Sequence, residues 1–292
     1  MLHLKPVSKN SSDPLVVGLY ENILSLFVVE TVPLSFQYLA NFPDFFSYVW
    51  SKSLLNLHSS VFAQNTDQLI SAAVHAIEEI YQKSPTMQEF VERMSPHEKA
   101  YLLQTVNSVM RLNGQLLLLS IGIRESIKGV FIGQKLVTGA VLGARIDVEE
   151  DFPTQVKQYK PRDVFKPEEV RITSTSSLLA PLFSGGLAVS SLPHFFAHID
   201  SEMYSLIKTE KYLEKRVFLE QLAMQASYRL PYPFGASYQE ILRLAGGKPY
   251  VHELLYLLVE TFPTAYPRML FTTAVMLAAL GSTQPKSPVT LS

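Results

Sequence analysis

The chain has 292 residues, of which 47% are hydrophobic and 17% charged, and its net charge is −1. Such a composition supplies a large core and gives no strong field that would attract nucleic acid or an acidic membrane surface. The chain has no cysteine, which excludes disulfides, thiolate catalysis and cysteine-bound zinc. We expect one large domain or two of about 150 residues, with no nucleic-acid partner.

Targeting and membrane-spanning patterns are missing from the sequence. Residues 1–14 are polar, and the longest apolar run, 269–280, is shorter than the roughly 18 residues that a membrane helix needs. We therefore expect a soluble, cytoplasmic protein that does not enter a membrane. The Ser- and Pro-containing end, 282–292, is expected to be a disordered tail.

Helical patterns dominate the first part of the chain. Asp13 is a capping residue before Pro14, and this pair predicts a helix start. A short helix is expected over 35–41, and Pro43 opens the next one. An amphipathic helix is expected over 66–82.

A capping box formed by Ser95 and Glu98 predicts a further helix to about residue 112. Asn113-Gly114 is expected to interrupt this helix before an apolar helix over 115–128. Residues 129–143 contain four glycines and indicate a loop or a small hairpin. Strand signals are otherwise scarce, so the predicted class is all-α.

The sequence also repeats itself. Residues 42–46 (FPDFF) return as 192–196 (LPHFF), and 102–123 is matched by 254–277, both at an offset of about 150 positions. We expect two helical repeats, 14–144 and 176–281, related by a pseudo-twofold axis with a cleft between them. The charged, proline-containing stretch 145–175 is interpreted as their connector.

No nucleotide-binding, zinc-protease or serine-hydrolase motif occurs. His194 and His198 lie four positions apart, as two metal ligands on a helix would, but no third ligand is placed by the sequence. We interpret them as surface residues and expect no metal and no cofactor. His252-Glu253 is interpreted as a polar pair at a helix start.

Three other features could carry chemistry. Asn113 lies between two apolar stretches, where it is either a cap or kink or a neutral amide able to orient a water or a carboxylate. Ser184, Gly185 and Gly186 precede a predicted helix and form either a turn or an anion-binding start. Arg124-Glu125 is either a surface pair at a helix end or a buried charged pair.

Several segments resemble the group I 2-haloacid dehalogenase family. They are residues 19–23 (LYENI), 38–43 (YLANFP) with Trp50, Asn113 with 124–126 (RES), and the second proline unit at Pro193. The resemblance implies an all-helical, duplicated chain with an alkylhydroperoxidase-like fold and an active site between the repeats. In that family an aspartate activates a water that displaces halide from the α-carbon, and an asparagine helps to hold that water.

The family's asparagine falls on Asn113 and its serine on Ser184, but its catalytic aspartate falls on Gly185. Aromatic pocket residues of the family fall on Thr31 and Leu34. Without a carboxylate at residue 185, no base at that position could take a proton from water.

We therefore expect a dehalogenase-like helical protein that binds a small apolar or carboxylate ligand between its repeats, with Asn113 as the residue corresponding to a catalytic one. Dehalogenation is not expected. Two alternatives remain open. One is a hydrolytic dehalogenase-type enzyme with a relocated base at His194, His198, Asp200 or Glu125. The other is a structural protein without a ligand, for instance a homo-oligomer.

Overall fold

The computed structural model describes residues 3–130, 132–133 and 192–282, and within these ranges all regular structure is helical. The predicted all-α class is thereby confirmed. The helices are α1 (Pro14–Phe27), α2 (Leu34–Leu39), α3 (Pro43–Leu57), α4 (Ser60–Ile80), α5 (Pro85–Arg93), α6 (Pro96–Ile127), α8 (Leu192–Leu206), α9 (Glu210–Tyr228), α10 (Tyr238–Ala245), α11 (Val251–Tyr256) and α12 (Phe262–Ala279); a π-helical turn, η3 (Leu257–Thr261), joins the last two.

Side-chain caps begin most of these helices. The carboxylate of Asp13 accepts a hydrogen bond from Leu15 N at the start of α1, and Ser95 and Glu98 form the complete predicted capping box of α6. Each cap satisfies an N–H group that has no partner within the helix. Local sequence therefore predicted these two helix starts correctly.

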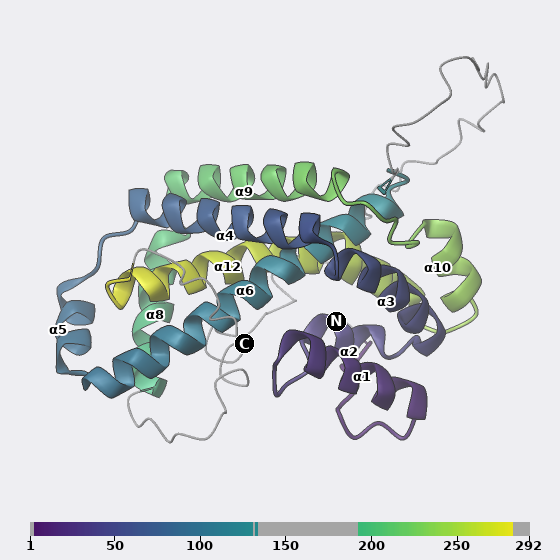
Figure 1. The fold of residues 1–292 in the computed structure, drawn as a ribbon, viewed down its shortest axis with the longest axis horizontal. Helices are drawn as coiled ribbons and strands as arrows, with labels where there is room; N and C mark the ends of the chain where they lie inside the picture. Colours follow the sequence, from purple (N-terminus) through teal and green to yellow (C-terminus); the bar gives the residue numbers. More distant parts are fainter. Residues whose placement is uncertain (1–2, 131, 134–191, 283–292) are drawn as a thin grey trace, which may run out of the picture.

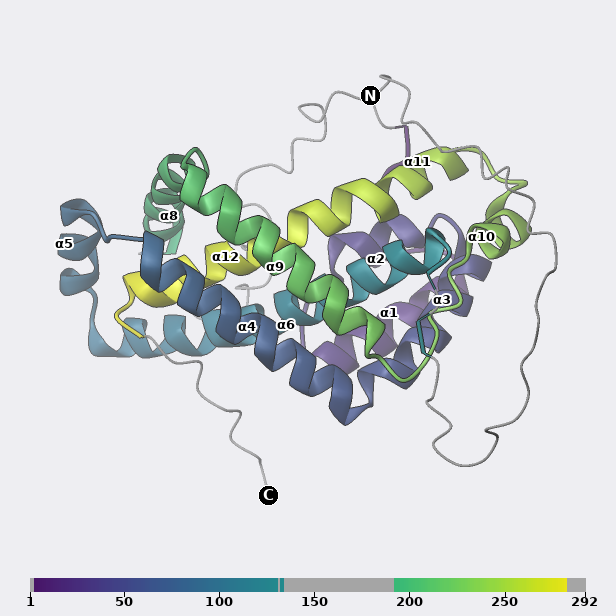
Figure 2. The ribbon, with the colours of Figure 1, turned by 90° about the horizontal axis from the view of Figure 1, so that it is seen from above.

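The helices form two layers (Figures 1 and 2). Helices α4 and α9 lie side by side in one layer, and α6 and α12 lie beneath them, with the most extensive contact between α6 and α12. Helices α5 and α8 lie at one end of the molecule, and α1, α2, α3 and α10 lie at the other. Both layers thus combine a helix from before residue 134 with a helix from after residue 191.

One continuous core joins these elements. Phe36, Phe46 and Trp50 form an aromatic cluster near the N-terminal helices, with ring centroids 5.3–6.0 Å apart. Across the halves, Phe234 packs so closely on Gly122 of α6 that a Cβ at residue 122 would lie 2.2 Å from its Cε2 atom. The chain therefore buries its apolar surface between halves as well as within them.

The expected interruption at Asn113-Gly114 is wrong, because α6 runs unbroken from Pro96 to Ile127. Gly114 faces α4, and a Cβ there would lie 3.1 Å from Ile70 and 3.2 Å from Thr66. The glycine permits close approach of two buried helices, and the packing outweighs its roughly 1 kcal/mol helix penalty. The nearby asparagine is consequently neither a cap nor a kink.

The predicted duplication stays a prediction, with which the order of helix lengths is compatible. In the first part of the chain, α3, α4 and α5 have 15, 21 and 9 residues, and the 32-residue α6 follows them. After residue 191, α8, α9 and α10 have 15, 19 and 8 residues in the same order, and α11 to α12 follow them. The caps Ser59 and Thr209 lie 150 positions apart. The expected connector, 145–175, and residues 283–292 of the expected tail lie outside the described residues.

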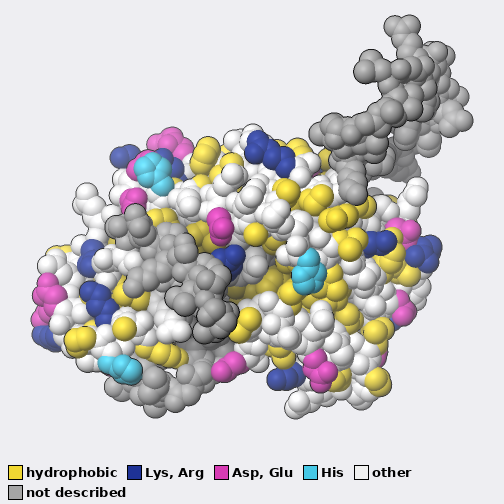
Figure 3. Space-filling model, in the orientation of Figure 1, with side chains coloured by type: hydrophobic (Ala, Val, Ile, Leu, Met, Phe, Trp, Pro, Cys, Tyr) yellow, Lys and Arg dark blue, Asp and Glu magenta, His cyan; other side chains and the backbone are white. Residues whose placement is uncertain are grey.

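Helix α9 also carries apolar side chains on its solvent side, namely Leu213, Val217 and Phe218, each about half exposed at 50–54%. This surface is compatible with a homo-oligomer, which stays a prediction. Figure 3 shows that Lys and Arg side chains on one face of the molecule are spread out and not gathered into one area. Within the described ranges, no helix combines the length and apolarity needed to cross a membrane.

Candidate functional site

Asn113 lies inside α6 with its side chain turned toward α12. It is 0% exposed. Its Nδ2 donates a long hydrogen bond of 3.4 Å to the carbonyl oxygen of Met269, while its Oδ1 atom has no hydrogen-bond partner among the described residues. A buried amide oxygen that lacks a donor lowers the free energy of unfolding by about 1–3 kcal/mol, so this group destabilises the fold.

Helix α12 supplies the facing backbone. The Met269 carbonyl also accepts a 3.2 Å hydrogen bond from Thr273 Oγ1, so it is satisfied without Asn113. Two residues before Met269, Pro267 lies inside the helix and provides no N–H group for the carbonyl four residues before it. The π-helical turn η3 precedes this segment, and such turns are frequent at functional sites.

The first turn of α2 contacts the same helix. Thr31 and Leu34 are half-buried, and the adjacent Ser35 accepts a 2.6 Å hydrogen bond from the buried Tyr266 hydroxyl. Burial raises the pKa of Tyr266, so its hydroxyl stays a donor at neutral pH. Tyr266 and Met269 are three positions apart on α12 and share a face. The structure thus brings the segment of Thr31 and Leu34 and the side chain of Asn113 to one stretch of α12.

The remaining predicted ligand contacts, Ser184, Gly185 and Gly186, lie outside the described residues. Their proposed roles as an anion-binding turn and as the position of the family's aspartate stay predictions.

The candidate bases on α8 are not hydrogen-bonded to Asn113. His194 is exposed, and Asp200 is half-buried. The ring of His198 packs on Phe90 of α5, with centroids 4.9 Å apart. In the described part of the chain, no group of three His, Cys, Asp or Glu side chains is arranged to hold a metal ion.

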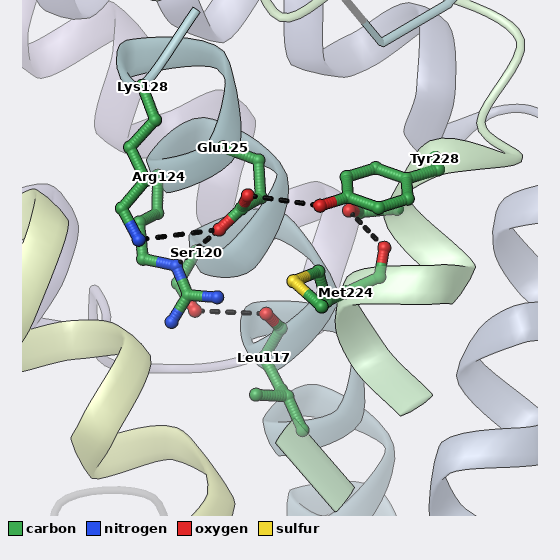
Figure 4. Close-up of polar contacts among 8 residues, drawn as sticks. Leu117, Ser120, Arg124, Glu125, Lys128, Met224 and Tyr228 are labelled. Atoms are coloured by element: carbon green, nitrogen blue, oxygen red, sulfur yellow. Dashed lines mark hydrogen bonds and ion pairs between the residues drawn. The ribbon is translucent and has the colours of Figure 1, made fainter. Parts of the chain in front are cut away.

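Glu125 is buried near the C-terminal end of α6, and not at the surface as the simpler interpretation held (Figure 4). Its Oε1 accepts a hydrogen bond of 2.8 Å from Arg124 Nε and lies 3.7 Å from Lys128 Nζ, while its Oε2 accepts one of 3.2 Å from the Tyr228 hydroxyl on α9. Burial and then the charge of Glu125 raise the pKa of Tyr228. The cluster ties the ends of two helices together.

This cluster is remote from Asn113. The two residues are twelve positions apart on one continuous helix, which corresponds to about 18 Å along its axis. A base must lie within about 3 Å of the water that it activates. Glu125 therefore cannot act on a water held by Asn113.

Glu253, interpreted from the sequence as part of a polar pair, does lie at the start of α11, but it is a buried carboxylate. It accepts hydrogen bonds from His3 N at 2.8 Å, Leu4 N at 2.7 Å and His3 Nδ1 at 2.9 Å, and Tyr250 stacks on the His3 ring. The N-terminal segment is thereby fixed to the second half. No local pattern indicates this contact, because the partners lie about 250 positions apart.

No known protein-family model matches the chain, and no curated protein matches it in sequence. Solved structures of D-2-haloacid dehalogenase do match it. A mutant enzyme is 18% identical with a TM-score of 0.67, covering 94% of this chain and 96% of that chain. The enzyme with L-LA gives the same values, and a mutant with D-2-CPA gives 17% identity and a TM-score of 0.68 over the same shares.

These similarities cover nearly the full length of both chains. They establish that the protein has the all-helical fold of the D-2-haloacid dehalogenases. At such low identity a shared fold does not show a shared reaction, since unrelated chemistries occur on one fold. The function therefore has to be inferred from the side chains of this chain.

Proposed function

We propose that the protein binds a small organic acid with an apolar body beside Asn113, between α6 and α12, and that it does not release halide. The observation that carries this proposal is the Oδ1 atom of Asn113, which is fully buried and lacks a hydrogen-bond donor. Buried polar groups are almost always paired, and Asn113 differs from Asn107, whose Oδ1 also lacks a partner, in that the whole residue is buried.

The chemistry of the surroundings supports a ligand of this class. An Asn oxygen accepts hydrogen bonds, so it suits a hydroxyl, a protonated carboxyl or a water carried in by the ligand. The nearby stretch of α12 also contains Tyr266 and Met269, whose side chains are largely apolar and suit an apolar body. Net charge near zero gives no long-range attraction, so specificity would depend on these short contacts.

The absence of halide release is proposed on two grounds. The family's catalytic aspartate falls on Gly185 in the sequence resemblance, and glycine cannot take a proton from water. Glu125, the buried carboxylate that could have replaced it, is engaged by Arg124 and is about 18 Å along α6 from Asn113.

Two measurements test the proposal together. Ligand-observed NMR with propionate, lactate and 2-chloropropionate should show saturable binding to the wild type that Asn113→Leu abolishes. Ion chromatography should find no chloride from racemic 2-chloropropionate above a protein-free control. Chloride release by the wild type that is lost in Asn113→Ala would establish instead an enzyme with a relocated base. If none of the three acids binds, the proposed class of ligand is refuted.

The variant Gly185→Asp tests the assignment of residue 185. Chloride release gained by this variant would support the correspondence with the family's aspartate. A double variant, Gly185→Asp with Asn113→Leu, is the matched control, since it should lose whatever activity the first change creates.

A further inference from the structure

The solvent side of α9 carries an apolar patch formed by Leu213, Val217 and Phe218, each about half exposed. Helices α4 and α9 form an outer layer of the molecule, and no described helix lies over them (Figures 1 and 2). We propose that this layer is the interface of a homodimer, in which the α9 patches of two copies meet at a twofold axis. This inference does not depend on the function proposed for the Asn113 region.

Helix α4 shows that the outer layer does not require apolar side chains at these positions. Both α4 and α9 begin at a side-chain cap. Eight and nine positions after its cap, α9 exposes Val217 and Phe218, whereas α4 exposes Asp67 and Gln68 at the same distances from its own cap. Apolar side chains gathered on only one of two neighbouring outer helices indicate a contact surface.

The size of the layer suits a dimer. Helix α9 has 19 residues and is therefore about 28 Å long, and α4, with 21 residues, is slightly longer. Two helices packed roughly 8–10 Å apart present a face roughly 20 Å wide. Face-to-face contact of two such layers buries roughly 1,100 Å² in total, which reaches the size of a specific but modest interface. The apolar patch would form its centre and the polar residues around it the rim.

The charges of α9 favour an antiparallel arrangement of the two copies. The exposed acidic residues Glu210 and Glu214 precede Val217, whereas Gln221 and Gln225, which are exposed after it, carry no charge. An antiparallel pair centred on Val217 places Glu214 opposite Gln221 of the partner subunit, so acidic side chains of the two copies do not meet. A parallel pair would place each glutamate beside its own counterpart, which is unfavourable.

Sedimentation velocity of the full chain from about 1 to 200 μM tests the association. We expect a reversible equilibrium between monomer and dimer. Val217→Asp and Phe218→Gln introduce the residues that α4 has at the same positions, and each should raise the dissociation constant about tenfold or more, because apolar contacts are lost. The control Leu242→Gln changes an exposed apolar residue of α10, outside the layer, and should leave the association unchanged.

A single introduced cysteine tests the position of the axis, because the chain has no cysteine of its own. Val217→Cys should form a covalent dimer under mild oxidation, since the two copies of this residue meet at the axis, and Leu242→Cys should not. Circular dichroism of each variant shows whether the fold is kept.

Four results would overturn the proposal. They are a wild type that stays monomeric at every concentration, a folded Val217→Asp protein that associates like the wild type, an equal loss of association in Leu242→Gln, and cross-linking of Leu242→Cys as readily as of Val217→Cys. A monomeric wild type would assign the patch to a contact other than a second copy of this chain.

Discussion

Replacing Asn113 by Leu tests whether its amide serves the fold or a ligand. Leucine has the same branched shape and the same number of side-chain heavy atoms. It removes an unpaired buried oxygen, which costs about 1–3 kcal/mol in the wild type. It also removes the 3.4 Å hydrogen bond to the Met269 carbonyl, which is long and leaves that carbonyl with its bond from Thr273.

The sum of these free-energy changes favours the folded state of the variant. The lost bond offsets at most about 1 kcal/mol, and leucine's better helix propensity adds a few tenths of a kcal/mol. We expect Asn113→Leu to gain about 1–2 kcal/mol of unfolding free energy, or roughly 2–5 °C in melting temperature. The assay is urea and thermal unfolding followed by circular dichroism, with and without the organic-acid probes. The variant should lose all ligand-induced stabilisation.

Asn107 provides the control. It lies on the same helix, its Nδ2 donates to Leu103 O at 2.7 Å, and its Oδ1 also lacks a partner, but it is remote from the Met269 contact. Asn107→Leu should leave ligand binding intact. If Asn113→Leu instead loses more than about 2 kcal/mol, the amide is a structural group and the reasoning is refuted.

Three further predictions concern stability and local order. Gly122→Ala should cost roughly 1–3 kcal/mol in urea unfolding because its methyl would collide with an aromatic ring, whereas Gly18→Ala, with open space around it, should gain roughly 0.5–1 kcal/mol. Arg124→Met should cost roughly 2–3 kcal/mol by leaving the Glu125 carboxylate buried with weaker partners, and a wild-type melting curve would contradict this. Glu253→Gln should speed amide hydrogen exchange in residues 3–7 by about tenfold or more, with unchanged exchange counting against the N-terminal attachment.

Local sequence predicted much of the fold. The start of α1 at Asp13 and the capping box at Ser95 were correct because a cap depends on residues only two or three positions away. The break predicted at Asn113-Gly114 was wrong because that prediction also depended on neighbouring residues alone. The local preference of this pair favours a break, but Ile70 lies against the glycine, and that tertiary contact keeps the helix continuous.

The candidate sites were harder to predict. Asn113 was identified by its unusual place in an apolar stretch, but its contact with Met269 joins residues 156 positions apart. The burial of Glu253 could not be predicted either, since its hydrogen bonds to His3 and Leu4 join residues about 250 positions apart. Non-local pairings of this kind leave no periodic trace in a single sequence.

The interleaving of α4 with α9 and of α6 with α12 has a consequence for how the chain can be assembled. Neither residues 1–133 nor residues 192–292 alone could cover their apolar helix faces, because the largest contacts join the two parts. Separately expressed fragments should each remain collapsed but poorly packed, and mixing them should restore the native molecule by complementation. Folding of the intact chain must likewise wait for contacts between distant segments, so we expect it to be slow for a helical protein.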